Sequence, residues 1–324
     1  MAIRHPYIDR AKGLAIVLVV IGHVVANEPP PGAEWYSTLK HWIYIFHMPL
    51  FVFLSGLTFG FSLRVPTGVV DYFQTLRQRT SRLMTAYFVI GVLIFFGKLV
   101  FQQFTAVDNP VHGVDSLLDL ALRPMLSFSR FLWYVYALSL LYAALPLLFK
   151  LSGKRLWPLV IVAALLPLLP TSNWLAWHKI QELAFFFVLG IAAGRHHPQF
   201  ERLLQRAWAL SLLVFLLMLP WVPNDSVWAA FCCIFAIVGL AGLLRTSWGD
   251  HLTALQQIGA FTLSIYLFNT IVIGLVKTAW VATLGWEGAR FVPAFFALAL
   301  AGVIVPIAMK RLLFSRVPAL DRIT

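Results

Sequence analysis

Charge and cysteine are both scarce in this sequence. Only 12% of the 324 residues are charged, about half the share of an ordinary soluble domain, and 60% are hydrophobic. The two cysteines, Cys232 and Cys233, are adjacent in an apolar stretch, which excludes a disulfide framework and a metal-type spacing and favours small packing residues. Low-complexity segments and clear internal repeats are also missing. The chain is therefore not expected to fold as a soluble globule.

Apolar residues occur in runs close to the ~20 residues that a helix needs to cross a bilayer. These runs are too long for strands and lack the alternation of a transmembrane barrel. The sequence predicts an all-α, polytopic transmembrane helical bundle of about ten helices, with residues 1–324 forming one membrane domain. The expected helices span residues 13–26, 43–63, 83–101, 131–149, 156–170, 182–194, 207–222, 227–244, 257–276 and 292–309.

Basic residues gather on one side of this expected bundle. If the N-terminus lies inside and each helix changes the side, most of the 25 lysines and arginines fall in inside segments. The positive-inside rule then places both termini in the cytoplasm. The formal net charge of +12 is explained by membrane orientation and does not indicate a nucleic-acid partner.

The first expected helix carries ionisable side chains on one face. Lys12 and His23 are eleven residues apart, which is about three turns with a rise of about 16 Å. Lys12 is expected at the cytoplasmic interface and His23 more than halfway across. Ionisable residues inside a membrane segment indicate function by default. The alternative is that Lys12 only anchors the topology and that His23 is a hydrogen-bonded packing residue.

The second expected helix supplies another histidine. A short loop makes the first two helices an antiparallel hairpin, with His47 about one turn inside the second, so the two histidines should have similar depth. Pro49 has no backbone N–H and frees a carbonyl nearby, a break that is tolerated where another group pairs with the backbone. The alternative for His47 is an interfacial histidine that faces headgroups.

Five segments together resemble the membrane acyltransferase-3 family. Residues 9–15, followed by Gly22 and His23, resemble the opening signature of the family: Arg or Lys, ten further residues, then His. Residues 46–51 with Ser55 and Gly56 closely resemble its second motif. Residues 79–83, 132–134 and 259–269 are similar to three weaker motifs. The last of these commonly ends in His, where this chain has Asn269.

The resemblance implies an integral membrane O-acyltransferase of the bacterial inner (cytoplasmic) membrane. Such an enzyme moves an acyl group, usually acetyl, from cytoplasmic acyl-CoA to a hydroxyl of a surface or lipid-linked glycan. Acetyl-CoA is then expected as the donor substrate, with no permanently bound cofactor and no metal. The expected partners are acyl-CoA, the glycan or lipid-linked saccharide acceptor and membrane lipids. Nucleic acid is not expected, and a homo-oligomer is compatible with the sequence.

Roles for individual residues follow from the same resemblance and from the chemistry. A hydroxyl nucleophile needs a base with a pKa near neutral, which histidine supplies. His23 is expected as that base, or else as a transient acyl carrier, while His47 assists it or polarises the acyl carbonyl. Glu182, at the start of the sixth helix, is expected to orient a histidine or bind sugar hydroxyls, or else is a headgroup-level cap.

Further residues are expected to hold the two substrates. Fixed cations bind phosphates, although arginines before a membrane helix can also serve topology alone. The expected donor-binding cations are Lys12, Arg79 and Arg82. The expected substrate-binding residues are Trp133, Asn269 and Asp9.

Two other functions remain open at this point. A transporter or flippase of a lipid-linked glycan or small solute could use the histidines as a proton relay. The lack of a clear internal repeat weakens a transporter of the inverted-repeat type. The chain could also be a non-catalytic scaffold in a polysaccharide-export complex. Only the enzyme predicts that purified protein hydrolyses acetyl-CoA or transfers its acetyl group.

Overall fold

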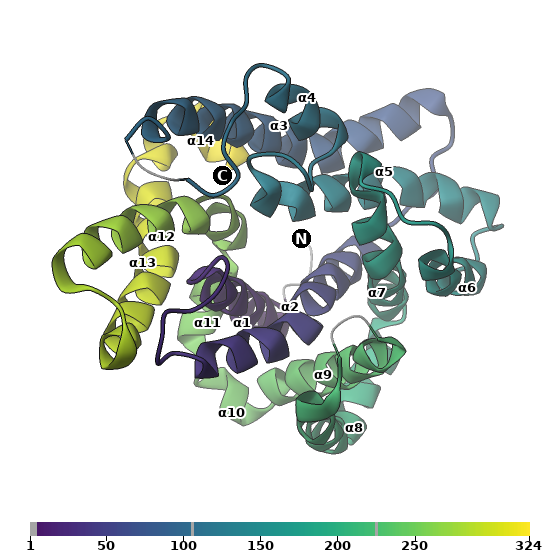
Figure 1. The fold of residues 1–324 in the computed structure, drawn as a ribbon. Coiled ribbons are helices and arrows are strands. Elements are labelled where there is room, and N and C mark those ends of the chain that lie inside the picture. The colour runs from purple at the N-terminus through teal and green to yellow at the C-terminus, as the bar shows by residue number, and fades with distance from the viewer. Residues whose placement is uncertain (1–4, 105–106, 224–225) are drawn as a thin grey trace. The chain divides into compact units, whose positions relative to one another are not determined.

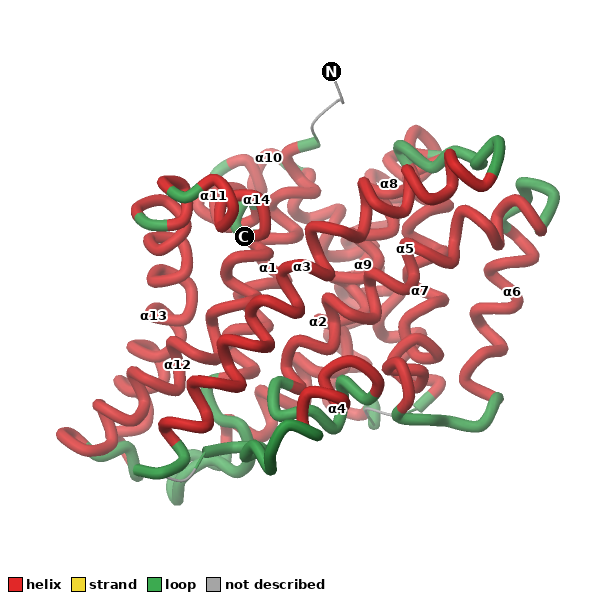
Figure 2. Tube along the Cα trace, turned by 90° about the horizontal axis from the view of Figure 1, so that it is seen from above, coloured by secondary structure: helices red, strands yellow, loops and turns green. Residues whose placement is uncertain are grey.

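Helices make up most of the described chain (Figure 1). The computed structural model describes residues 5–104, 107–223 and 226–324. These ranges contain fourteen α-helices and no strand, and Figure 2 shows only helices joined by loops. The predicted all-α fold is confirmed.

Each of the ten expected segments overlaps a helix, but the segment 257–276 is broken at Ala260 and Phe261, between the helices Thr253–Gly259 and Thr262–Leu284. Among the described residues, eight helices are long and apolar enough to cross a membrane, which defines a multi-pass membrane protein. Two matching helices fall outside that set: α1, whose first turns hold three charged residues, and α6, which has 9 residues. The ten are α1 (Pro6–His23), α2 (Trp35–Gly60), α3 (Val69–Phe101), α5 (Trp133–Leu151), α6 (Trp157–Leu165), α7 (Trp177–Arg195), α8 (His197–Met218), α9 (Val227–Arg245), α12 (Thr262–Leu284) and α13 (Phe291–Leu312).

Several helices begin earlier than expected; α8, for example, begins at His197, ten residues before its expected start at 207. Helix α2 begins at Trp35, so His47 lies about three turns inside it and not one. Lys40 and His41 interrupt the apolar run there, but both donate to backbone carbonyls and remain helical. Helix α3 begins at Val69, so most of residues 64–82, which separate the second and third expected helices, are helical. Arginine is a good helix former, and the 33-residue α3, about 50 Å long, can extend beyond a bilayer.

The chain forms two compact units. Unit 1 contains Met1–Ser55 and Ala193–Val317, and unit 2 contains Gly56–Ala192 and Pro318–Thr324. In unit 1, α1 packs against the short helix α11 (Thr253–Gly259) and against α9, α12 and α13, while α8 packs on α9. In unit 2, α3 packs against α5, α4 (Ser116–Leu122) and α14 (Pro318–Ile323).

Two glycines allow α1 and α11 to cross with their backbones in contact. A Cβ atom at Gly13 would overlap the carbonyl oxygen of Leu255, and one at Gly259 would overlap the carbonyl oxygen of Asp9. Both glycines belong to segments that resemble family motifs. The crossing therefore places α11 against the first half of α1, and any larger residue must push two backbones apart.

Gly13→Ala is expected to lower the free energy of unfolding by ~1–3 kcal/mol, because a backbone carbonyl cannot turn aside as a side chain can. Gly274→Ala is the matched control, since its added Cβ meets no atom within 4 Å in the interior of α12. That control should be neutral or stabilising by about 0.5–1 kcal/mol. Thermal unfolding of purified protein in detergent measures both. Equal melting temperatures for the two variants would contradict the close crossing.

Candidate functional site

The C-terminal end of α1 is held by two tyrosines of α2. The last carbonyls of a helix have no partner within the helix, and an unpaired carbonyl is costly in a membrane. The hydroxyl of Tyr36 donates to the carbonyl of Ile21 at 2.7 Å, and that of Tyr44 donates to the carbonyl of Gly22 at 3.1 Å. A Cβ atom at Gly22 would lie 2.6 Å from the Tyr44 ring. A larger residue directly before His23 would therefore have to displace the Tyr44 ring.

Lys40 completes this set of contacts. Its ammonium donates to the carbonyls of Val25 and Ala26 at 2.8 and 2.9 Å and lies 5.5 Å from the centroid of the Tyr44 ring. Tyr36, Lys40 and Tyr44 are four residues apart, so they share one face of α2. None of the three was predicted from the sequence. Their regular spacing just before the second motif is the signal that could have revealed them.

The ring of His23 is oriented by α12. Its Nδ1 atom lies 2.8 Å from Oδ1 of Asn269, which also accepts a hydrogen bond from the hydroxyl of Thr270 at 3.2 Å. The amide nitrogen of Asn269 donates to the carbonyls of Ile265 and Tyr266, each at 2.8 Å, so the amide oxygen faces His23. An amide oxygen only accepts, and therefore Nδ1 of His23 carries the hydrogen. In the neutral ring, Nε2 then holds the lone pair.

The Nε2 atom of His23 is available for chemistry. It makes no hydrogen bond to any described residue, and the side chain is partly exposed. Asn269, in contrast, is 0% exposed, and its amide bonds only to protein groups. The arrangement gives a fixed imidazole whose basic atom has no hydrogen-bond partner among the described residues.

His47 is held in the same tautomer. Its Nδ1 atom lies 2.8 Å from the carbonyl oxygen of Ile43, so Nδ1 donates and the neutral ring has its lone pair on Nε2. The ring contacts Tyr44 at a centroid distance of 5.0 Å, and Tyr44 also binds the carbonyl of Gly22 beside His23. The structure thus links both predicted histidines within unit 1, although the start expected for α2 was wrong.

The carbonyl freed by Pro49 has a specific partner. Pro49 cannot donate to Ile45, and Sγ of Cys233 in α9 lies 2.9 Å from the Ile45 oxygen and donates to it. Cys232 is also buried and is a free cysteine. Cys233 therefore does more than the packing expected of both cysteines, because it satisfies the backbone one turn before Pro49.

The first half of α1 contains Asp9 and Lys12, both partly buried. Arg10 lies between them and is buried. Its guanidinium donates to the carbonyl of Leu244 at 3.0 Å and pairs with Asp250 at 2.7 Å. It thereby binds the C-terminal end of α9, where a cation is favourable. Arg10 therefore has a structural role, because it joins α1 to the end of α9.

A cluster of metal-ligand residue types lies at the junction of α1 and α8. The ligand atoms of His5, His197 and Glu201 fall within 4.8 Å of one another. The Tyr7 hydroxyl lies 2.9 Å from Nε2 of His197, and the Arg245 guanidinium lies 3.5 Å from Glu201. A fixed guanidinium beside the carboxylate disfavours a metal cation. These contacts are better explained as packing of α1 on α8 and α9.

Two predicted residues of unit 2 are joined by a lysine. The Lys179 ammonium lies 2.7 Å from Oε2 of Glu182 and 5.6 Å from the centroid of the Trp133 ring. Glu182 is exposed and Trp133 partly exposed. The sequence did not single out Lys179, which has no motif of its own.

The two predicted arginines of unit 2 are on α3. Arg79 donates to the hydroxyl of Ser62 at 2.6 Å, and its guanidinium lies 5.4 Å from the centroid of the Phe59 ring. Arg82 donates to the backbone oxygen of Thr324 at 2.8 Å. A guanidinium has five N–H donors, so these contacts leave donors on both arginines for an anion.

Comparison with known proteins defines the class. A family model described as an acyltransferase domain matches residues 5–311. The chain therefore belongs to this acyltransferase family, which confirms the resemblance seen in the sequence. No solved structure matches it.

Three curated relatives are similar to the chain. Inner membrane protein YcfT of Escherichia coli is 25% identical over 313 residues, covering 89% of this chain and 84% of that protein. Nodulation protein NolL of Sinorhizobium fredii is 30% identical over 70% of this chain and 56% of its own length. NolL of Mesorhizobium japonicum is 29% identical over 46% of this chain and 37% of its own length. The chain thus spans about half the length of the nodulation proteins or less.

Cys233→Ala is expected to lower the melting temperature more than Cys232→Ala, by the equivalent of about 1 kcal/mol, the low end of the cost of an unpaired buried acceptor. Both changes remove one buried sulfur, but only the first leaves the Ile45 carbonyl without its donor. Cys233→Ser keeps a donor and should recover most of the loss. If the two alanine variants unfold together, the thiol makes no useful hydrogen bond.

Proposed function

We propose that the chain is an O-acyltransferase of the bacterial inner membrane. It moves an acyl group, preferably acetyl, from acyl-CoA to a hydroxyl of a surface or lipid-linked glycan. Membership of the acyltransferase family supports the class of reaction. The observation that carries the mechanism is the His23 ring, fixed by Asn269 with the lone pair of Nε2 directed away from that contact.

The reaction uses His23 first as a base and then as an acid. Nε2 takes the proton of the acceptor hydroxyl while the hydroxyl oxygen attacks the thioester carbonyl. The tetrahedral intermediate breaks its C–S bond, and the leaving thiolate takes the proton back from Nε2. During the step in which His23 is an imidazolium, the hydrogen bond from Nδ1 to Oδ1 of Asn269 stabilises its positive charge.

Asn269 acts on His23 and not directly on substrate. Its amide is fully buried and fully hydrogen-bonded within the protein, so it is a positioning residue. An asparagine oxygen supplies the acceptor that His23 needs without itself titrating. His47 donates from Nδ1 to Ile43, so its neutral ring offers only a lone pair at Nε2. That favours orienting the acceptor hydroxyl over polarising the acyl carbonyl, which requires a donor.

The remaining roles follow from charge and exposure. Lys12, Arg79 and Arg82 bind donor phosphates, and the two arginines retain unused N–H donors for this purpose. Asp9, one turn before Lys12, belongs to the same donor-binding end of α1. Glu182 and Trp133, held together through Lys179, offer a carboxylate and an aromatic face to the sugar acceptor.

His23→Ala should lower acetyl transfer by about 10²–10⁴-fold, because the general base is lost. Melting temperature and acyl-CoA affinity should stay near wild type, since the ring bonds to only one helix. His41→Ala is the matched control: His41 also lies in the helical hairpin and bonds a backbone carbonyl at 3.2 Å. Its loss should reduce stability, with activity falling only in proportion. Turnover, thermal stability and donor affinity are measured on one preparation of each variant.

A stable His23→Ala protein that transfers acetyl at nearly the wild-type rate would remove His23 from the mechanism. His47→Ala is assayed beside it to rank the two histidines. Labelled acetyl-CoA tests the transfer itself. The acceptor is identified by comparing the glycan masses of wild-type and deletion cells, since the acceptor glycan should lose the mass of one acetyl group in the deletion cells. If purified wild-type protein neither transfers nor hydrolyses the label, a transporter or scaffold replaces the enzyme.

A further inference from the structure

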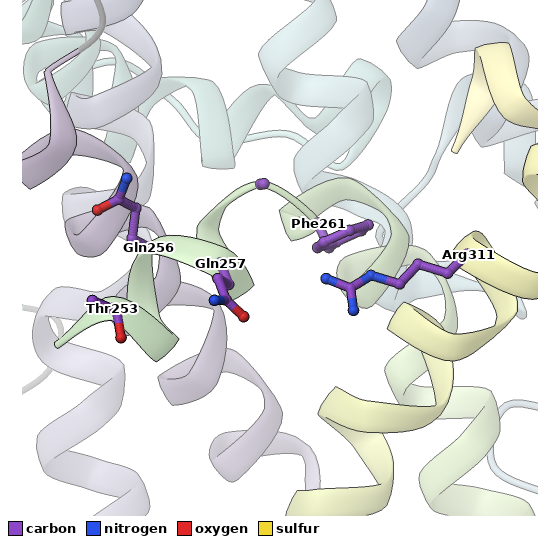
Figure 3. A pocket seen from close by; sticks show the side chains of 6 residues that line it. Thr253, Gln256, Gln257, Phe261 and Arg311 are labelled. Carbon is purple, nitrogen blue, oxygen red and sulfur yellow. The ribbon is translucent and has the colours of Figure 1, made fainter.

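A second site-like feature lies in unit 1, at the ends of helices that lead to His23. A hollow of about 430 Å³ opens between α11, the start of α12 and the end of α13 (Figure 3). Its size is within the range of about 300–1,000 Å³ that is typical of small-molecule sites. The lining residues are Thr253, Gln256, Gln257, Ala260, Phe261 and Arg311.

The polar groups of this pocket are not used by the protein. Figure 3 shows Arg311 reaching from α13 toward Phe261, and its guanidinium lies 4.9 Å from the centroid of that ring. Arg311 forms no ion pair within the described part of the chain. The side-chain amides of Gln256 and Gln257 and the hydroxyl of Thr253 likewise make no hydrogen bond to described residues. A guanidinium, an aromatic ring, two amides and a hydroxyl thus face one open space.

This combination matches a phosphorylated adenosine. A guanidinium binds phosphate through parallel N–H groups. Purine bases stack on aromatic rings and on guanidinium planes, and here the guanidinium carbon of Arg311 lies over the Phe261 ring, 4.9 Å from its centroid. The amide of glutamine both donates and accepts, which fits the edge of adenine. We propose that this pocket binds the 3′-phosphoadenosine end of the acyl-CoA donor, an inference that rests on the proposed function.

The position of the pocket agrees with the shape of the donor. Phe261 directly precedes α12, and Asn269 lies about 12 Å further along that helix, where it holds His23. Helix α11 crosses α1 at Gly13, about 15 Å along α1 from His23. The pantetheine arm of coenzyme A is a long flexible chain between adenosine and thioester. With adenosine in the pocket, the arm runs along α1 and α12 toward Nε2.

Lys12 supports the same placement. It directly precedes Gly13, whose backbone contacts Leu255 of the pocket-bearing helix α11. Lys12 is therefore suited to the diphosphate that joins adenosine to the arm, and Arg311 to the single 3′-phosphate. An anionic lipid headgroup could bring a phosphate to Arg311 as well. It has no purine for the ring and the amides, which is why the nucleotide is favoured.

The test is direct binding, measured by calorimetry on the purified full chain in a neutral detergent without anionic lipid. The probes are coenzyme A, 3′-dephospho-coenzyme A and pantetheine. Arg311→Gln should weaken coenzyme A binding by about tenfold to a hundredfold, as expected for a lost charge-assisted contact, and leave the dephospho form and pantetheine unchanged. Arg316→Gln makes the same change on an exposed arginine outside the pocket and should leave all three affinities unchanged.

Each other outcome overturns the pocket assignment in a different way. If Arg311→Gln and wild type bind coenzyme A equally, the pocket is not the adenosine site, and the proposed function stands. If wild type binds no probe at all, the proposed function fails with it. Titration of both proteins with phosphatidylglycerol nanodiscs tests whether the phosphate bound by Arg311 comes from a lipid headgroup instead of the nucleotide. If Arg311→Gln weakens lipid binding and leaves coenzyme A binding unchanged, the pocket holds a headgroup.

Discussion

Backbone carbonyls that a helix leaves unpaired are the constraint on which this site depends. In a membrane such a group needs a partner within the protein. Helix α1 ends at His23, and the carbonyls of Ile21 and Gly22 in its last turn are bound by side chains of α2. The carbonyl freed by Pro49 is bound by Cys233. Both histidines therefore lie beside backbone breaks that other helices stabilise, and the same contacts that complete the fold fix their positions.

One further hydrogen bond turns a positioned histidine into a directed base. The two N–H groups of Asn269 are bound by its own helix, which leaves the oxygen to face His23. The backbone carbonyls of α12 thereby set the tautomer of His23, because they fix the orientation of the Asn269 amide. An imidazole without this contact would divide between two tautomers. In the tautomer with its hydrogen on Nε2, the lone pair is on Nδ1 and points into the protein.

Much of the fold followed from the sequence because a membrane helix needs only a long apolar run. A helix occupies most of each of the ten expected segments, and the motif residues His23 and Asn269 do meet. The predicted helix starts were wrong where Lys40 or arginines interrupt the apolar run. Hydropathy does not include the hydrogen bonds that these side chains donate to carbonyls distant in the sequence. The roles of Cys233 and Gly13 were also hidden, because each depends on a backbone atom far away in the chain.

The most direct test of the central claim is the tautomer of His23 itself. Protein labelled with ¹⁵N-histidine, with His23 assigned by comparison with His23→Gln, can be measured by solid-state NMR in lipid bilayers. The account predicts that neutral His23 carries its hydrogen on Nδ1 and that Asn269→Leu, similar in size but without an acceptor, yields a mixture of tautomers. A hydrogen on Nε2 in the wild-type protein would contradict the assignment of Nε2 as the base.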